Sequence, residues 1–315
     1  MRILLVGASG FVGGHLAPRL VEAGHDLVCA VRASSDYTPP EGAERIELDL
    51  DRPLDPATLP SADAVLHFAQ ANVRFPEGAR ELDRVNAASV VELLDHARES
   101  GATRFVYASS ASVYGLADEF PTTERHHHHN NDTLYGAAKS FNEGLVRSFR
   151  AMRGLDYVGL AYFNVYGPRM DVHGAYTEVL VRWMERIADG EPPLIFGDGR
   201  QTMDFVCVPD IARANILAAA SGVVEGRYNI ASGGETSLLE LAEALLRAMG
   251  SDLGVEHGPE RAVNGVTRRL ADIGAARRDL GWAPTIGLED GLRMLVEWWR
   301  PLREEIAAGR LVTSR

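Results

Sequence analysis

The sequence predicts an α/β protein in which a doubly wound parallel sheet is joined to a smaller α/β portion. In the first half of the chain, short continuous apolar runs alternate with segments of helical periodicity. This alternation is typical of parallel strands that helices cover on both faces. Beyond residue 168 the elements become shorter and glycine and proline more frequent, and a length of 315 residues suits two units of about 150 residues each.

The elements follow from these patterns in chain order. Strands are predicted at residues 2–6, 27–31, 64–68, 104–108 and 157–163. Helices are predicted at residues 11–23, 80–100 and 134–149, and then at residues 179–188, 211–220, 237–249 and 288–299. A further strand at residues 204–208 follows a glycine- and proline-rich stretch, residues 190–199.

Charge and composition exclude several classes of partner. The chain has 32 basic and 44 acidic residues, a net charge of −12 and no basic stripe, so neither a nucleic-acid backbone nor an anionic membrane is an expected partner. No apolar run approaches the roughly 18 residues of a spanning helix, and the N-terminal residues do not resemble a signal peptide. Cys29 and Cys207 lie in apolar runs and are expected to be free thiols, so we expect a cytoplasmic protein.

Three glycines between the first predicted strand and the first predicted helix indicate a phosphate-binding loop. Gly7 allows a tight turn, Gly10 lets a pyrophosphate approach backbone N–H groups, and Gly13 lets the helix pack closely on the sheet. Phe11 and Val12 belong to the same segment and are expected beside the cofactor. A plain glycine turn is the alternative, but the place of the loop in the first βαβ unit favours a dinucleotide-binding Rossmann domain.

The residues after the second and third strands bear on which dinucleotide is bound. A NAD-binding protein usually has an acidic residue at the end of the second strand, but here Arg32 and Ser34 follow it and could hold the 2′-phosphate of NADP. Asp36 lies close enough to the end of this strand to serve as the acidic residue that bonds the ribose 2′-hydroxyl of NAD. Asp49 could bond the adenine amino group or cap its own loop. The cofactor is therefore NAD or NADP, and Arg32 favours NADP.

A tyrosine and a lysine four residues apart indicate proton-transfer chemistry. Tyr135 and Lys139 share one face of a predicted helix, and the strand before it ends in hydroxyl residues. A free tyrosine has a pKa near 10, which a nearby ammonium and a positive nicotinamide ring would lower, so Tyr135 could act as a base at neutral pH. Lys139 is also the one lysine among 32 basic residues. Codon bias and chance spacing are the alternatives, against which the glycine loop gives the pair weight.

Five motifs are spread over nearly the whole chain. They are GASGFVG at residues 7–13, YASSASVYG at 107–115, YGAAK at 135–139, YFNVYGPR at 162–169 and DFVCVPDIA at 204–212. Together they resemble the extended short-chain dehydrogenase/reductase family, in particular its NAD-dependent epimerases and dehydratases of nucleotide sugars. The resemblance implies Tyr135 as catalytic base and acid, Lys139 as the anchor of the nicotinamide ribose, and Ser110 as the hydroxyl partner. It also implies a set of residues that line the cofactor: Asp49, Leu50, Phe68, Ala69 and Asn86.

The resemblance gives the two units their expected roles. Residues 1–165, with later returns near 201–222, are expected to form the dinucleotide-binding domain. Residues 166–200 and 223–300 are expected to form a substrate-binding cap, and residues 301–315 a C-terminal tail. The family also implies a homodimer, formed through the helices at residues 80–100 and 134–149.

Departures from the family pattern bear on the reaction. Relatives that dehydrate or decarboxylate their substrate carry a carboxylate just after the active-site hydroxyl, where this chain has Ala111 and Ser112. Met203 and Ala161 stand where many relatives place arginines, and the first of these arginines binds the substrate diphosphate. The carboxylate-dependent reactions are therefore not expected, and other arginines must hold the diphosphate.

Five positions are candidates for substrate binding. Asn164 is implied to contact the sugar or the diphosphate. Arg169, Arg261 and Arg268 are candidates for the diphosphate, because guanidinium groups bind phosphate oxygens in pairs. Phe196 is a candidate for stacking near the base. For each arginine the ordinary alternative is a solvated surface residue, and for Phe196 it is an aromatic residue of the core.

Residues 126–129 are four consecutive histidines shortly before the predicted active helix. Adjacent side chains in an extended loop point alternately apart, and no cysteine or acidic ligand set accompanies the run, so no metal site is expected. A loop at the substrate mouth is the expected role.

The sequence thus predicts a nucleotide-sugar epimerase acting at C4 of a UDP-hexose, or of its uronate or N-acetyl derivative, through a transient 4-keto intermediate and bound NAD(P). An NADPH-dependent nucleotide-keto-sugar reductase is the alternative that Arg32 favours. A non-catalytic dinucleotide-binding regulator could use the same fold, but the complete set of Tyr135, Lys139 and Ser110 argues against it.

Overall fold

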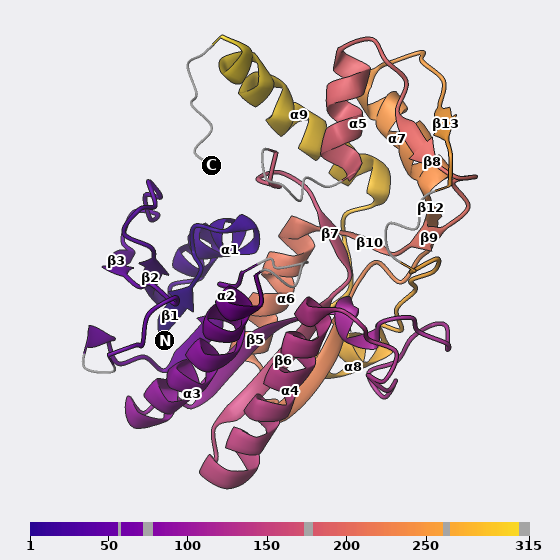
Figure 1. Ribbon diagram of the computed structural model, residues 1–315. Coiled ribbons are helices and arrows are strands. Elements are labelled where there is room, and N and C mark those ends of the chain that lie inside the picture. The colour runs from indigo at the N-terminus through magenta and orange to yellow at the C-terminus, as the bar shows by residue number, and fades with distance from the viewer. Residues whose placement is uncertain (56–57, 72–77, 173–178, 261–264, 309–315) are drawn as a thin grey trace.

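A seven-stranded parallel sheet forms the centre of the molecule in the computed structural model, which describes residues 1–55, 58–71, 78–172, 179–260 and 265–308 (Figure 1). The strands lie in the order β11-β6-β5-β4-β1-β2-β3. Their bounds are β1 Arg2–Val6, β2 Asp26–Val31, β3 Glu44–Glu47, β4 Ala64–His67, β5 Arg104–Ser110, β6 Asp156–Tyr162 and β11 Glu225–Ile230. Every neighbouring pair is parallel, which confirms the predicted doubly wound fold class.

Helices cover both faces of this sheet. Their bounds are α1 Phe11–Glu22, α3 Ser89–Glu99, α4 Leu134–Arg153 and α6 Val208–Ala220. In β1, Ile3 and Leu5 join the apolar core under α1 and α6, whereas Leu4 and Val6 join the core under α3 and α4. Because successive strand side chains point to opposite faces and both faces are covered, the strand reads as an uninterrupted apolar run.

The helix predicted at residues 80–100 forms, but it is not regular throughout. Its first turn, α2 (Ala79–Asp83), passes through a π-helical turn, η3 (Arg84–Ala88), into α3. Asn86 in this turn is buried, and its side-chain amide makes 2.7 Å hydrogen bonds with both the N–H and the C=O of Ala71. The irregular turn therefore presents a polar side chain to the loop after β4.

The smaller α/β portion lies beyond the carboxyl edge of the sheet (Figure 1). Its helices are α5 Val179–Ala188, α7 Leu238–Met249 and α9 Leu288–Ala307. Its short strand pairs are β7 Asn164–Tyr166 with β10 Phe205–Cys207, β8 Leu194–Phe196 with β13 Glu256–Gly258, and β9 Thr202–Met203 with β12 Thr236–Ser237. The three helices share one apolar core, in which Trp183, Leu245 and Leu295 are buried.

The main sheet and its covering helices include segments that the predicted domain bounds assign to the cap. β11 pairs with β6 along its whole length, and α8 (Gly274–Leu280) packs against it. Both elements lie within residues 223–300, which the sequence assigned to the cap. β11 begins with exposed and half-exposed residues at the edge of the sheet, so it lacks the continuous apolar run that marks the central strands.

Two buried carboxylates hold these returns in place. Asp204 accepts hydrogen bonds from the N–H groups of Ser232 and its neighbour, and from Ala271, at 2.7 to 3.2 Å. Asp210, in the first turn of α6, accepts from the N–H groups of Thr285 and the next residue, at 2.8 and 2.9 Å. Each carboxylate thus satisfies backbone donors of segments that are distant in sequence.

Two further features complete the description. Cys29 and Cys207 are both buried and free. Within the described ranges, no helix combines the length and the apolar character that crossing a bilayer requires.

Candidate functional site

The carboxyl ends of the central strands gather many of the residues that the sequence singled out (Figure 1). Gly7 follows β1, Phe68 and Ala69 follow β4, and Ser110 is the last residue of β5. In a parallel sheet these ends form one edge, which is the usual place of a ligand site.

The glycine loop has the geometry that the spacing predicted. Gly7 has a φ of 94°, a region that favours glycine, and a Cβ there would lie 2.6 Å from the backbone nitrogen of Ala69. A Cβ at Gly13 would overlap the carbonyl oxygen of Gly7. Gly10 is the N-cap of α1, and neither a capping side chain nor an acidic residue occupies the first turn. The helix N-terminus therefore suits a negatively charged group such as a diphosphate.

The residues after β2 and β3 are less decisive. Arg32 and Asp36 are both exposed. Asp49 accepts a hydrogen bond from the N–H of Asp51 at 3.1 Å, so it caps its own turn, as one of the two interpretations of the sequence held. Leu50 is buried in the core under α3, so only its backbone is available to a ligand.

The loop after β4 supplies a site residue that the sequence analysis did not single out. Nε2 of Gln70 donates a hydrogen bond of 3.0 Å to Oη of Tyr135. The side-chain amide of Asn86 bonds both backbone groups of the next residue, Ala71, and so fixes the conformation of this loop. Gln70 lies in the segment that resembles cofactor-lining residues of the family, but no spacing rule marks it as a partner of Tyr135.

Tyr135 and Lys139 lie together in the first turns of α4, as their spacing predicted. The N-cap Thr133 accepts a hydrogen bond from the N–H of the third residue along, at 3.1 Å, which fixes the start of the helix. Nζ of Lys139 lies 5.6 Å from the ring centroid of Tyr135 and 4.8 Å from that of Tyr107. The same nitrogen donates to the carbonyl oxygen of Ala108 at 2.5 Å. The ammonium thus joins α4 to β5.

Ser110 ends β5 close to the start of α4. Its Oγ accepts a hydrogen bond from the N–H of Ser112 at 3.1 Å and so caps the short helix η4 (Ala111–Tyr114). A Cβ at Gly136 would lie 2.6 Å from the carbonyl oxygen of Ser112, so only a glycine lets α4 approach this strand end. Gly136 directly follows Tyr135, which brings the hydroxyl-bearing strand end beside the tyrosine.

Glu143 lies one helical turn beyond Lys139 and was also missed from the sequence. It accepts a short hydrogen bond from Oγ of Ser109, and its carboxylate is 2.9 Å from Nε of Arg227 on β11. Burial raises the pKa of Glu143, and the charge of Arg227 opposes this shift. The i, i+4 spacing from Lys139 was the signal that could have identified it.

The electrostatics of the site centre on the buried ammonium. Lys139 is 4% exposed, and burial lowers its pKa to about 7, which the nearby Glu143 opposes. His67 stacks on the Tyr107 ring at 6.1 Å, and burial together with the charge of Lys139 lowers its pKa to about 3. His67 is therefore neutral at physiological pH, whereas Lys139, whose pKa lies near neutrality, carries its positive charge in part there.

The predicted substrate residues do not lie together. Asn164 begins β7 and donates from Nδ2 to the carbonyl oxygen of Asp204 at 3.0 Å. Arg169 has a φ of 70°, and a Cβ at Gly14 would lie 2.5 Å from its Nε, so its side chain lies against α1 next to the glycine loop. Phe196 is in β8 in the smaller portion. Arg169 is therefore on the side of the dinucleotide loop, not in the expected cap.

Two neighbouring arginines, Arg268 and Arg269, have different partners in the structure. Nε and Nη2 of Arg268 each lie 2.7 Å from an oxygen of Glu235, so this guanidinium already binds a carboxylate. Arg269 instead donates from Nη1 to the carbonyl oxygen of Ala111 at 2.8 Å, and burial lowers its pKa to about 10. In an extended segment adjacent side chains point to opposite sides, which is why these two arginines have different partners. Arg261 lies outside the described residues.

The histidine run has an acidic neighbour after all. Nε2 of His126 lies 2.8 Å from Oδ1 of Asp118, eight residues upstream, and Nε2 of His127 lies 3.6 Å from Oδ2 of the same residue. Nε2 of His128 instead lies 3.6 Å from Oε2 of Glu143. The expectation that no acidic side chain accompanies the run is therefore wrong, because the loop folds back on itself.

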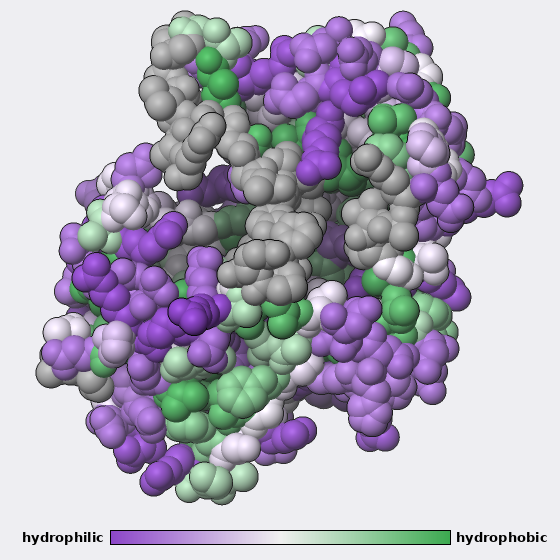
Figure 2. All heavy atoms as spheres, viewed as in Figure 1, coloured by the Kyte–Doolittle hydropathy of each residue, from purple (hydrophilic) through white to green (hydrophobic). Residues whose placement is uncertain are grey.

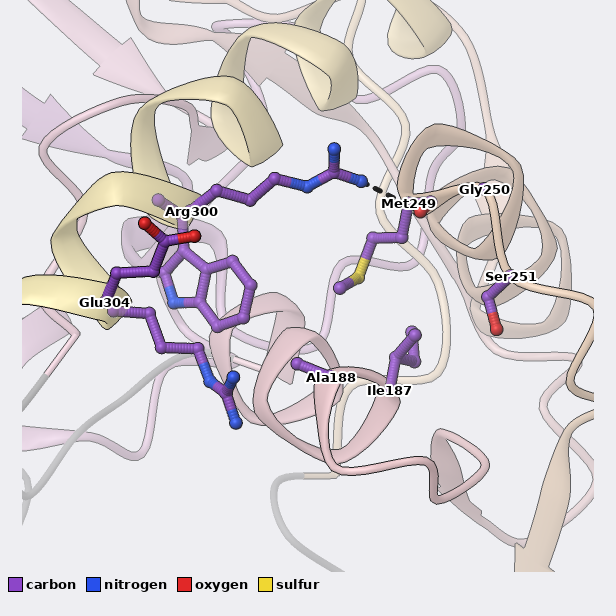
Figure 3. Close-up of a pocket in the computed structure, with 9 residues that line it drawn as sticks. Ile187, Ala188, Met249, Gly250, Ser251, Arg300 and Glu304 are labelled. Carbon is purple, nitrogen blue, oxygen red and sulfur yellow. Dashed lines mark hydrogen bonds between the residues drawn. The ribbon is translucent and has the colours of Figure 1, made fainter. Parts of the chain in front are cut away.

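A separate pocket lies in the smaller portion, among α5, α7 and α9 (Figure 3). It is lined by Ile187, Ala188, Met249, Gly250, Ser251, Trp299, Arg300, Arg303 and Glu304. One guanidinium nitrogen of Arg300 donates to the carbonyl oxygen of Met249 at 2.9 Å. This pocket contains none of the residues that the sequence singled out, so the carboxyl edge of the sheet remains the candidate site.

Comparison with known proteins gives a consistent result. The NAD dependent epimerase/dehydratase family model matches residues 3–231. A UDP-glucose 4-epimerase of Mycolicibacterium smegmatis is 33% identical over 313 residues, covering 95% of this chain and 99% of that protein. The structure of a UDP-glucose 4-epimerase of Thermotoga maritima with UDP-glucose matches with a TM-score of 0.86 at 31% identity, covering 96% and 100% of the two chains. A UDP-glucose 4-epimerase of Thermus thermophilus in complex with NAD matches with a TM-score of 0.81 at 27% identity, covering 95% and 99%.

The buried ammonium should give stability a characteristic pH dependence. The pKa of Lys139 is about 7 in the folded chain and 10.5 as the reference value, so between these limits the unfolded chain binds more protons and stability rises with pH. In Lys139→Met this contribution is absent. We expect the stability of the variant relative to the parent to fall by about 1 to 2 kcal/mol from about pH 7 to about pH 9, in urea unfolding of the cofactor-free protein. Arg147→Met, on an exposed position of the same helix, should show no such trend. A flat profile for Lys139→Met would mean that the ammonium is not buried as described.

Proposed function

Because the chain belongs to the NAD dependent epimerase/dehydratase family, we propose that it is a nucleotide-sugar epimerase with NAD as its resident cofactor. Its substrate in this proposal is a UDP-hexose, or the uronate or N-acetyl derivative of one, inverted at C4 through a transient 4-keto sugar. The observation that carries the proposal is the Tyr135–Lys139 pair at the carboxyl edge of the sheet, with Gln70 bonded to the tyrosine oxygen.

The residues around the glycine loop fit the diphosphate of NAD. The first turn of α1 offers backbone N–H groups that no side chain caps, and Gly10 adds no side chain above them. Arg169 lies against the same helix and could add a positive charge. When bound, NAD supplies the acceptor and donor of the C4 hydride. Arg32 favoured NADP, but a similar epimerase structure contains NAD, so NAD is the cofactor that we propose.

In this proposal Tyr135 carries the proton of the C4 hydroxyl group. The ammonium of Lys139 favours the phenolate, so Oη takes the proton as C4 becomes a ketone and returns it after the sugar has presented its other face. The hydrogen bond from Gln70 to the same oxygen also favours the negative charge. Ser110, at the strand end beside the tyrosine, is suited to donate to the C4 oxygen.

The surroundings of Ser110 favour epimerisation over loss of water or carbon dioxide. The next residue is Ala111, so no carboxylate follows the serine. The carbonyl oxygen of Ala111 accepts a hydrogen bond from Arg269. Glu143 is on the same helix as Tyr135, but it is paired with Arg227 and bonded to Ser109. Since Ser109 and Ser110 are adjacent in β5, their side chains point to opposite faces, and Glu143 lies away from the proposed sugar site.

Arg269 is the cation that we propose for the substrate. It is largely buried at the active strand end, bonded to a neutral carbonyl group, whereas Arg268 is paired with Glu235. A diphosphate would therefore bind Arg269 without first displacing a carboxylate. In a substrate with a uronate group, the same guanidinium would suit the carboxylate.

We also propose a homodimer formed through α3 and α4. Figure 2 shows apolar side chains gathered on the surface over these two helices. On α4, Phe141 is 52% exposed and Met152 is 74% exposed, and the half-buried Leu145 and Phe149 lie between them at helical spacing. An apolar stripe of this kind on a soluble protein is typical of a protein–protein interface.

Epimerase activity can be tested by proton NMR. The purified protein with a panel of UDP-, CDP-, GDP- and dTDP-sugars should give a second anomeric signal for a UDP-sugar, without added NAD(P)H. Tyr135→Phe should lower this turnover at least about 100-fold, because the proton carrier is lost, while the amount of nucleotide bound to the protein stays the same. A ketone-dependent consumption of one NADPH per turnover would instead establish the reductase. Unchanged turnover in Tyr135→Phe would remove this residue from the mechanism.

The two neighbouring arginines should differ in their effect on substrate binding. Arg269→Ala should weaken binding of UDP, measured by calorimetry with the NAD-loaded protein, about 10- to 100-fold, because a charged hydrogen bond to phosphate is lost. The matched control, Arg268→Ala, should change UDP affinity less than about threefold, since Glu235 already occupies that guanidinium. The reverse result would return the diphosphate to Arg268.

The dimer proposal predicts a change of oligomeric state. Phe141→Asp places a charge in the proposed apolar interface, and the variant should sediment as a monomer in analytical ultracentrifugation at concentrations where the parent is a dimer. Val224→Asp is the matched control, because Val224 is similarly exposed at 49% but lies outside α3 and α4. A monomeric parent protein, or equal effects of the two variants, would contradict the interface.

A further inference from the structure

We infer that Asp118, His126 and His127 form a binding site for Zn²⁺ on the loop that leads to the active helix. One ligand atom from each residue lies within 4.8 Å of the others. Imidazole nitrogen and carboxylate oxygen are ligands that zinc prefers, and three protein ligands leave a fourth position for water. The site is separate from the proton-transfer residues, and it does not depend on the proposed epimerase activity.

The distances between the ligand atoms are close to those of a zinc site. With bonds of about 2.0 to 2.1 Å, a tetrahedral zinc ion holds its ligand atoms about 3.3 Å apart. Here Nε2 of His126 is 2.8 Å from Oδ1 of Asp118, and Nε2 of His127 is 3.6 Å from Oδ2. These two distances involve different oxygens of Asp118, and one ligand atom from each of the three residues lies within 4.8 Å of the others, so side-chain rotations would bring one oxygen and both nitrogens around the ion.

His126 is held in the orientation of a metal ligand. It is 6% exposed, and its ring meets the ring of the buried Tyr114 edge to face at 5.7 Å. Its Nδ1 lies 2.7 Å from the carbonyl oxygen of His127, and its Nε2 lies 2.8 Å from Oδ1 of Asp118, so Nε2 is the nitrogen that faces the proposed ion. Metal-binding histidines in proteins usually make this second hydrogen bond, which fixes both tautomer and orientation.

His127 and Asp118 complete the site from its exposed side. The N–H of His129 donates to Nδ1 of His127 at 3.2 Å, so in the metal-free chain the proton of this ring is on Nε2. Zinc binding at Nε2 moves this proton to Nδ1 and gives up one long hydrogen bond. The bound ion with two neutral imidazoles and one carboxylate carries a charge of +1, which a chain with a net charge of −12 accommodates readily.

The site closes a loop that ends at the active helix. Asp118 follows η4, and the two histidines precede Asn131, whose Oδ1 accepts hydrogen bonds from the N–H and Oγ of the helix cap Thr133. A metal ion that joins the two ends of this loop binds the folded chain and not the unfolded chain, so its binding free energy adds to the stability of the folded chain. The expected consequence is a higher unfolding temperature in the presence of zinc.

Calorimetric titration with ZnCl₂ tests the inference, using the full chain without an affinity tag after removal of metal with EDTA. The parent protein should bind one equivalent of Zn²⁺, and Mg²⁺ at millimolar concentration should not compete. Asp118→Asn and His127→Ala should each weaken Zn²⁺ binding at least about tenfold and abolish the rise in unfolding temperature. Both positions are exposed, so both variants should unfold like the parent in EDTA.

His129→Ala is the matched control, because it removes an exposed histidine of the same run that lies outside the three-residue cluster. It should bind Zn²⁺ with an affinity within about twofold of the parent. A flexible histidine run would behave differently: Asp118→Asn would bind like the parent, and His129→Ala would lose affinity. Either of those results, or the failure of the parent to bind one equivalent, would overturn the site.

Discussion

The structure depends on a single ammonium group held away from water. Lys139 is 4% exposed, donates to the carbonyl oxygen of Ala108, and lies over the rings of Tyr107 and Tyr135. Removing such an ion from water costs several kcal/mol, which one carbonyl group and two ring faces offset only in part. The fall of its pKa to about 7 expresses this cost. The charged form of Lys139, present in part at neutral pH, acts on the tyrosine most strongly in a rigid surrounding, because any relaxation would admit water and weaken the influence of the charge.

That rigidity comes from segments that are far apart in the sequence. Glu143, one turn beyond the lysine, is paired with Arg227, and the guanidinium of Arg227 lies 4.8 Å from the ring centroid of Tyr114. Arg227 belongs to β11, which enters the sheet only after the chain has passed through the smaller portion. The active helix is thus supported by the strand that sequence reasoning assigned to the cap. The late return of the chain is therefore part of the construction of the site, and its role extends beyond completing the sheet.

What the sequence could reveal depended on periodicity. The bounds of β1 agree with the prediction residue for residue, because burial on both faces leaves a continuous apolar run, and the i, i+4 rule placed Tyr135 beside Lys139. Loops and edges have no such period. Asp118 meets His126 only because a loop folds back, and the edge strand β11 carries polar residues like those of a loop. Sequence alone named Arg268 and not Arg269, since alternation shows that the side chains of two neighbours point apart but not which of them faces the site.

The segment that carries Arg269 is also held by a group that Arg269 itself does not contact, the buried carboxylate of Asp204. Asp204 accepts a hydrogen bond from the N–H of Ala271, two residues beyond Arg269, and from the N–H of Ser232, just after β11. The buried carboxylate therefore ties the segment of Arg269 to the main sheet through backbone groups. Burial raises the pKa of Asp204, and the hydrogen bonds that it accepts oppose this shift. Each of these hydrogen bonds therefore helps to keep the carboxylate charged, and thereby strengthens the others. If the smaller portion moves when a substrate binds, the guanidinium of Arg269 should stay with the sheet. In the proposed epimerase, this tie would keep the phosphate site close to the proton-transfer residues, so that the nucleotide could remain anchored while the sugar presents its other face.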